Sequence, residues 1–145
     1  MQPVLRYVTV GLLSLLAAGC GGGGHESHGS ASDDKPTRTI DVVMREFAYE
    51  PAAVTVKAGE TVKFVFRNNG SIVHDAFLGD EAAQAEHERE MAAGDHHDGH
   101  AAIKVDPGQT GELTHTFDKA GKALIIGCHE TGHYAAGMKM TVTVT

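Results

Sequence analysis

Residues 128–138 read Cys128-His-Glu-Thr-Gly-His133-Tyr-Ala-Ala-Gly-Met138, which written as a pattern is C-x4-H-x4-M. An apolar run from Lys122 to Cys128 precedes this stretch, and a run that alternates in polarity from Met138 to Thr145 follows it. Both runs have the composition that is typical of strands. The sequence therefore predicts that one short loop between two strand ends carries a thiol, an imidazole and a thioether. Because a sheet holds its strand ends, these side chains would need little reorganisation to act together.

A second histidine, His74, lies in the predicted strand 72–78, just after the turn cluster Asn68-Asn69-Gly70-Ser71. Two histidines, one cysteine and a weak axial methionine form the coordination set of blue copper. The pattern therefore predicts a copper site made of His74, Cys128, His133 and Met138. Cys128 has two alternative interpretations, a buried structural thiol or a nucleophile. A nucleophile needs an oriented general base and an oxyanion hole, and neither is evident in the sequence.

Strand patterns account for most of the chain after residue 38. Eight short runs have strand character, namely 39–44, 54–56, 61–66, 72–78, 101–105, 112–117, 122–128 and 138–145. Turn-forming clusters of Gly, Asn, Asp and Pro separate many of them. About eight short strands joined by turns predict an all-β fold, an antiparallel sandwich or barrel. Val62, Phe64 and Phe66 share one face of their strand, and Lys63 and Val65 share the other. Met140 shares the parity of Met138, and we expect it in the core.

Residues 80–100 break the strand pattern, since they are rich in Ala, Glu and His. Asp80 can cap a short helix from Glu81 to about Met91, and residues 94–100 then form a loop. We interpret the segment as an insertion between two strands. Five of its side chains could form a secondary metal site, namely His87, Met91, His96, His97 and His100. The alternative is a solvated acidic loop with incidental histidines.

Residues 1–19 have the organisation of an export signal. Arg6 precedes an apolar stretch from Val8 to Ala18, which is too short to span a bilayer. The stretch ends in Ala17-Ala18-Gly19-Cys20, which resembles the bacterial lipobox, so we expect Cys20 to become a lipid-bearing N-terminus. An ordinary signal peptide is the alternative. Residues 20–38 are rich in Gly, Ser and His and are the expected flexible tether, so the protein should be exported and lipid-anchored to a membrane of the cell envelope.

Composition excludes some functions. The chain has 145 residues, enough for one ordinary domain, with 19 acidic residues against 12 basic ones and a net charge of −7. An acidic chain is a poor ligand for nucleic acid, so we expect no nucleic-acid partner. If Cys20 carries lipid, Cys128 has no disulfide partner in an oxidising compartment, and metal ligation is the best reason for its presence. Three other polar residues are expected to face solvent, namely His115, His129 and Glu130.

Residues 39–145, apart from the insertion, resemble the cupredoxins, the type 1 copper proteins that include plastocyanin, azurin and pseudoazurin. The similar stretches are residues 47–56, 59–64 and 68–74 and the C-x4-H-x4-M loop, which has azurin-type spacing. The resemblance implies a cupredoxin-like Greek-key β-sandwich that holds one Cu(I)/Cu(II) ion. In this family the residues matching His74, Cys128 and His133 surround the copper, and the residue matching Met138 is its weak axial ligand.

The resemblance also implies a route for electrons. His133 would be the exit, and Tyr134, Ala135 and Ala136 would form part of an apolar rim where a redox partner docks. Two positions depart from the family pattern. Val73 stands where azurin-like proteins have Gly, and Asp75 stands where many members have an Asn that braces the cysteine loop.

Two classes of function remain open. The first is a lipid-anchored carrier that passes electrons between partner proteins in the cell envelope, and the second is a protein for copper storage, delivery or tolerance. The complete set of four ligands favours the carrier, whereas the histidine-rich tether and insertion favour copper handling. We do not expect an enzyme, because one domain of this length is too short for the extra copper sites of a copper oxidase or reductase. Nothing in the sequence requires more than a monomer.

Overall fold

The computed structural model describes residues 35–94 and 101–145. The predicted export signal, the lipidation site Cys20, most of the tether, and His96, His97 and His100 lie outside the described residues. The described elements, in chain order, are β1 (Arg38–Arg45), β2 (Ala48–Glu50), β3 (Ala53–Val56), β4 (Glu60–Asn68), β5 (His74–Gly79), α1 (Glu81–Ala93), β6 (Ala102–Val105), β7 (Thr110–Phe117), β8 (Ala123–Gly127) and β9 (Lys139–Val144). The all-β prediction with one helical insertion is confirmed, and each of the eight predicted strand runs contains a strand.

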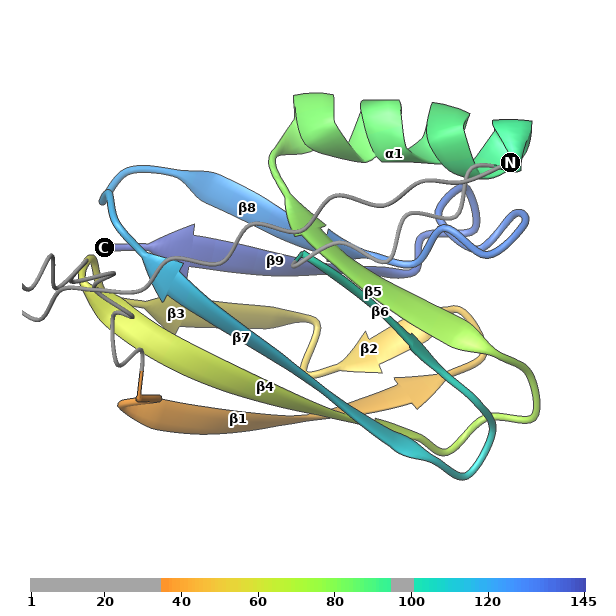
Figure 1. Cartoon of the computed structure of the whole chain (residues 1–145), viewed down its shortest axis with the longest axis horizontal. Coiled ribbons are helices and arrows are strands. Elements are labelled where there is room, and N and C mark those ends of the chain that lie inside the picture. The colour runs from red at the N-terminus through yellow and green to blue at the C-terminus, as the bar shows by residue number, and fades with distance from the viewer. Residues whose placement is uncertain (1–34, 95–100) are drawn as a thin grey trace, which may run out of the picture. The chain divides into compact units, whose positions relative to one another are not determined.

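The strands form two sheets that pack face to face (Figure 1). One sheet has the order β2-β1-β4-β7 and the other has the order β3-β9-β8-β5-β6. The predicted antiparallel pairing holds for five of the seven strand pairs in the described residues, and two pairs are parallel, namely β1 with β4 and β3 with β9. After β2 the chain crosses to the other sheet for β3 and returns as β4, so it re-enters the first sheet in the direction of β1. The strand β2 was not predicted, since two of its three residues, Ala48 and Glu50, are of types that are uncommon in strands.

The core lies between the sheets and follows the predicted alternation. Val62, Phe64 and Phe66 of β4 are fully buried, and the ring of Phe64 packs edge-on against Phe117 at 6.4 Å between centroids. Met140 is also fully buried, as predicted from its parity. Burial of each such large apolar side chain contributes about 1.5–3 kcal/mol. Two inward-facing rows of apolar side chains thus hold the sheets together and fix the ends of their strands.

Helix α1 lies outside the sandwich and packs against β5 and β8 (Figure 1). Asp80 caps it as predicted, because its carboxylate accepts a hydrogen bond from the backbone N–H of Ala83 at 3.0 Å. Gly94 ends the helix with a positive φ of 84°, a conformation that glycine adopts without strain. The side chains that α1 buries are polar, namely Gln84 and His87. Within the described residues, no helix has the length and apolar character needed to cross a bilayer.

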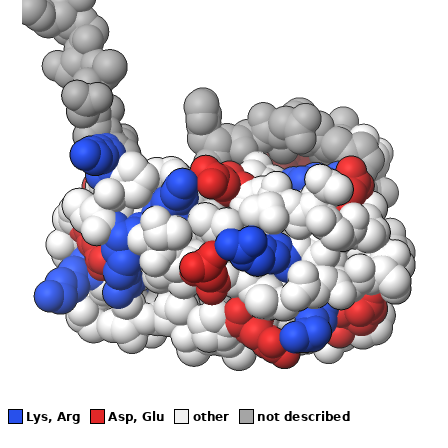
Figure 2. Space-filling view, turned by 90° about the horizontal axis from the view of Figure 1, so that it is seen from below, with Lys and Arg blue, Asp and Glu red and all other residues white. Residues whose placement is uncertain are grey.

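Charged side chains of both signs share the surface. In the view of Figure 2, Lys and Arg side chains lie among Asp and Glu side chains. Several of them form ion pairs, such as Lys63 with Glu112 at 3.2 Å and Arg67 with Asp41 at 3.3 Å. This face of the molecule therefore carries charges of both signs (Figure 2).

Candidate metal centre

Three of the four predicted copper ligands meet at one end of the second sheet. His74 is the first residue of β5, and Cys128 comes directly after β8. Because β5 and β8 are antiparallel neighbours, the start of one lies beside the end of the other. His133 comes from the loop between β8 and β9. Two strand ends and one loop therefore bring these three side chains together.

The loop that carries His133 and Met138 is fixed by its own backbone. Met138 donates its N–H to the carbonyl of His133 at 3.0 Å, and Cys128 donates its N–H to the carbonyl of Met138 at 3.2 Å. Gly137 has a φ of 97°, a region that side-chain-bearing residues rarely adopt, and it allows the chain to turn just before Met138. The two hydrogen bonds tie Met138 to the backbone of Cys128 and His133.

The donor atoms are close enough to share one ion. His133 Nδ1 lies 3.3 Å from Cys128 Sγ, His74 Nδ1 lies 3.9 Å from that sulfur, and the two Nδ1 atoms are 3.3 Å apart. A first-row ion such as zinc is bound at about 2.0–2.1 Å by imidazole and about 2.3 Å by thiolate, so donors in one plane around it lie about 3.5–3.8 Å apart. The observed separations bracket that range. The residues present therefore fit a metal ion with a nitrogen and sulfur donor set, which for these ligand types is the set of blue copper.

All four predicted ligands are shielded from solvent. His74, Cys128 and Met138 are fully buried, and His133 is 6% exposed. Burial raises the pKa of the Cys128 thiol to about 12, and the Asp75 carboxylate acts in the same direction. Burial lowers the pKa of His74, as does the nearby His133. The metal-free centre thus holds a thiol and a neutral His74 imidazole, so the nitrogen is ready to bind an ion and the thiol must first release its proton.

Asp75 braces the cysteine loop, at the position where many cupredoxins have Asn. Its backbone N–H faces Cys128 Sγ at 3.4 Å, and its carboxylate accepts the backbone N–H of His129 at 2.7 Å. The hydroxyl of Tyr49 donates to the backbone carbonyl of Asp75 at 2.6 Å. Burial raises the pKa of the Asp75 carboxyl. The carboxylate thus connects the strand of His74 to the residue that follows Cys128.

The prediction that His129 faces solvent is wrong. His129 is 4% exposed, because α1 covers it and Gln84 and Glu88 contact its two ring nitrogens. Glu130 is partly buried and pairs with Lys104 at 2.7 Å. Sequence reasoning missed this cluster because no local pattern shows that α1 folds back over the residue after the cysteine. The only local signal is a histidine that directly follows the predicted ligand.

An exposed aromatic side chain that the sequence analysis overlooked covers His133. Phe47 packs edge-on against the imidazole of His133, with 5.0 Å between ring centroids, and is 47% exposed. Of the predicted apolar rim, Ala135 and Ala136 are exposed. The ring of Tyr134 stacks on His129, and Lys139 Nζ lies 3.8 Å from its centroid. The surface beside His133 therefore includes an aromatic side chain from the loop between β1 and β2.

Of the five residues predicted to form a secondary metal site in the insertion, the structure describes two, His87 and Met91. His87 is buried and stacks on Phe77 at 4.1 Å, so it packs the helix against β5. Among the described His, Cys, Asp and Glu side chains, one group of three brings its ligand atoms within 4.8 Å of one another, and it consists of His74, Cys128 and His133. The hypothesis for His96, His97 and His100 concerns residues outside the described part of the chain.

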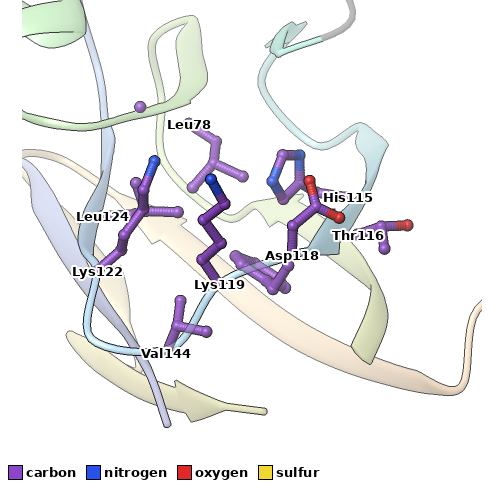
Figure 3. Close-up of a pocket in the computed structure, with 10 residues that line it drawn as sticks. Leu78, His115, Thr116, Asp118, Lys119, Lys122, Leu124 and Val144 are labelled. Carbon is purple, nitrogen blue, oxygen red and sulfur yellow. The ribbon is translucent and has the colours of Figure 1, made fainter. Parts of the chain in front are cut away.

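A separate hollow of about 330 Å³ lies at the opposite end of β8 from Cys128 (Figure 3). Leu124 of β8 and Lys122, just before that strand, line it on one side (Figure 3). His115, Asp118 and Lys119 line it from the end of β7 and the turn after it (Figure 3). His115 is partly buried there against Phe117, with 4.8 Å between ring centroids, so it is less exposed than predicted. The four predicted copper ligands do not contribute to this hollow.

Comparison with known proteins shows the family to which the chain belongs. Residues 37–145 match the family described as copper binding proteins, plastocyanin/azurin family. The copper-resistant cuproprotein CopI of Pseudomonas aeruginosa is 37% identical, with 74% of this chain and 76% of that protein aligned. The protein of the same name from Rubrivivax gelatinosus is 40% identical, with 76% of this chain and 68% of that protein aligned.

Solved structures agree on the fold. Reduced auracyanin from Roseiflexus castenholzii superposes with a TM-score of 0.66 at 26% sequence identity, with 76% of this chain and 98% of that chain covered. The sandwich, the buried nitrogen and sulfur donors and the family match agree on copper as the cofactor. This chain therefore belongs to the plastocyanin/azurin family of copper-binding proteins, the cupredoxins.

Proposed function

We propose that this cupredoxin binds one copper ion through His74, Cys128, His133 and Met138 and thereby protects the cell envelope against excess copper. The observation that carries this proposal is the assembled donor cluster, in which three ligand atoms lie within 4.8 Å of one another in the fold itself. Because the sheet and loop already position the donors, little conformational entropy is lost when copper binds. Soft sulfur and imidazole donors together suit copper in both of its oxidation states.

Two observations favour tolerance as the role of the centre. The relatives at 37% and 40% identity are both named copper-resistant cuproproteins. The donors are also buried, with His133 the most exposed of them at 6%, so copper held there would be shielded from other thiols in the envelope. In this role the chain acts as a binding protein and converts no substrate.

A second candidate function is electron transfer, which bound copper would support by cycling between Cu(I) and Cu(II). The specific observation in its favour is the exposed ring of Phe47 against His133. Ile72, two residues before His74, is also 40% exposed. Aromatic and aliphatic side chains next to a ligand offer an apolar contact on which a redox partner could dock.

The proposed place of action is the cell envelope. Export as a lipoprotein anchored at Cys20 rests on the residues around that cysteine, and the tether would hold the copper domain near the membrane as a monomer. Mass spectrometry of the mature full-length protein tests this part separately. A lipid-modified N-terminal Cys20 is expected, whereas an unmodified N-terminus at any other residue would contradict the anchor.

A growth assay tests the tolerance role. The assay uses a bacterial strain that lacks its own copper-resistant cuproprotein. This strain expresses the full-length protein, a Cys128→Ser variant or a Met140→Leu control, and growth is followed at rising copper concentration. We expect the wild type and the control to extend growth to higher copper and Cys128→Ser to give no protection. Equal protection by Cys128→Ser would contradict the proposal.

A second variant separates tolerance from electron transfer. Phe47→Glu places a charge on the exposed surface beside His133 without removing any predicted copper ligand. If sequestration protects the cell, Phe47→Glu should bind copper and preserve tolerance. If tolerance is lost while copper binding is intact, electron exchange with a partner underlies the role and the second candidate replaces the first.

A further inference from the structure

A fully buried glutamine joins α1 to the sheet beneath the copper loop. Gln84 is 0% exposed. Its amide nitrogen donates to the backbone carbonyls of Ile125 in β8 at 2.7 Å and of Phe77 in β5 at 3.1 Å. These two acceptors fix which end of the amide is the nitrogen, since a carbonyl oxygen there would face two other carbonyl oxygens.

The other end of the same amide faces the residue that follows Cys128. Gln84 Oε1 lies 2.7 Å from His129 Nε2, and because a carbonyl oxygen can only accept, the imidazole donates at Nε2. Glu88, one helical turn further along α1, pairs with His129 Nδ1. One face of α1 therefore contacts both ring nitrogens of His129.

Packing holds the same imidazole on its other sides. The ring of Tyr134 stacks on it at 4.6 Å with 16° between the planes, and the ring of His87 meets it edge-on at 4.9 Å. Its backbone N–H donates to the Asp75 carboxylate at 2.7 Å. The side chain of His129 is 0% exposed. Its backbone and its ring are thus fixed from both the β5 side and the α1 side.

We infer that Gln84 and Glu88 are positioning residues for the copper cysteine, which they hold in place through His129. His129 is bonded directly to Cys128, so a rotation of the His129 backbone would displace the sulfur. Partners that orient a ligand from outside the coordination sphere commonly change metal affinity by about 10–100-fold when they are removed. Helix α1, which the sequence presents as an insertion between two strands, then forms part of the copper centre. This inference rests on copper binding at Cys128, the first half of the proposed function, and is independent of the tolerance role.

The test compares variants of α1 in the full-length protein. Glu88→Ala removes the partner of His129 Nδ1. Because the Glu88 side chain is 46% exposed, the fold should be preserved. Gln84→Leu removes the partner of Nε2. Glu86→Ala is the matched control, because Glu86 lies on the same helix and pairs with the exposed Arg89. Circular dichroism of the metal-free proteins confirms that each variant is folded.

Two readouts respond to the position of the sulfur. They are the thiolate-to-copper charge-transfer band in the visible spectrum and the rate at which a chelator removes copper. We expect Glu88→Ala and Gln84→Leu to shift the band and to release copper about 10-fold faster or more, and the Glu86→Ala control to match wild type. A folded Glu88→Ala protein with the wild-type band and release rate would overturn the inference.

The same measurements separate this inference from the proposed copper site. If wild-type protein binds copper but shows no charge-transfer band, the assignment of Cys128 as a ligand fails. If wild type shows the band and folded Glu88→Ala shares its spectrum and release rate, the copper site stands and only the positioning role fails.

Discussion

Tyr49 connects the two sheets at the copper centre, and its hydroxyl offers a direct test of that connection. It lies in β2 of the first sheet, is 2% exposed, and donates to the backbone carbonyl of Asp75 in β5 of the second sheet at 2.6 Å. Tyr49→Phe removes this donor and retains the ring, which packs against Phe66 at 6.1 Å between centroids. A buried acceptor left without its donor costs about 1–3 kcal/mol of the free energy of unfolding.

The expected shift in melting temperature follows from the size of the domain. Unfolding entropy is about 2.1 cal/mol/K per residue, or about 0.23 kcal/mol/K for about 110 residues, so the loss corresponds to about 4–13 °C. Circular dichroism of the metal-free protein on heating measures it. Tyr134→Phe is the control and should lie within about 2 °C of wild type, since Tyr134 is only partly buried and the change keeps the ring that stacks on His129. An unchanged melting temperature in Tyr49→Phe would refute the idea that this hydroxyl ties the sheets together.

Three further predictions concern the metal, the thiol and pH. Met138→Leu should change the reduction potential and charge-transfer band of the copper protein, because it removes the predicted axial ligand. Met140→Leu should leave both unchanged and should lower the free energy of unfolding by less than about 1.5 kcal/mol. Equal spectra for the two variants would argue against Met138 as a ligand. Loading metal-free protein with copper near neutral pH should release the thiol proton of Cys128, because burial raises the pKa of this thiol to about 12. The released protons are measured with an indicator dye in weak buffer. Copper uptake without proton release would argue against thiolate ligation. Glu46→Gln should lower the urea midpoint of metal-free protein at pH 7, because hydrogen bonds from Ser71 lower the pKa of Glu46 from 4.5 to about 2. The stability that Glu46 contributes is present above pH 4.5 and lost as pH falls toward 2, so a constant difference between variant and wild type across that window would contradict this account.

Local patterns predicted eight of the nine strands in the described residues and three candidate copper ligands, His74, Cys128 and His133, that the fold brings together. Alternation in β4 predicted that Val62, Phe64 and Phe66 share one face, and the structure shows that this face is buried in the core. The spacing of Cys128, His133 and Met138 identified the loop that carries candidate donors. Both signals depend on neighbours within about ten residues. His74 was predicted because the blue copper set needs a second histidine and because His74 lies in a predicted strand.

Long-range contacts explain what local patterns missed. The parallel pairing of β1 with β4 depends on the chain crossing between sheets, which no turn motif encodes. Burial of His129 depends on α1 folding back onto β8, with Gln84 separated from His129 by 45 positions. Phe47 covers His133 from a loop 86 positions earlier in the chain. Each of these contacts is a consequence of the sandwich topology. Local sequence patterns therefore do not reveal it.

The most direct test of the central claim is the visible spectrum of full-length protein loaded with one equivalent of Cu(II), compared with Cys128→Ser treated in the same way. The close approach of Cys128 Sγ to the Nδ1 atoms of His133 and His74, at 3.3 Å and 3.9 Å, predicts an intense thiolate-to-copper band. Ascorbate should bleach the band, and Cys128→Ser should lack it. Copper bound by the wild type with only weak absorption, or a Cys128→Ser protein that keeps the band, would contradict the proposed centre.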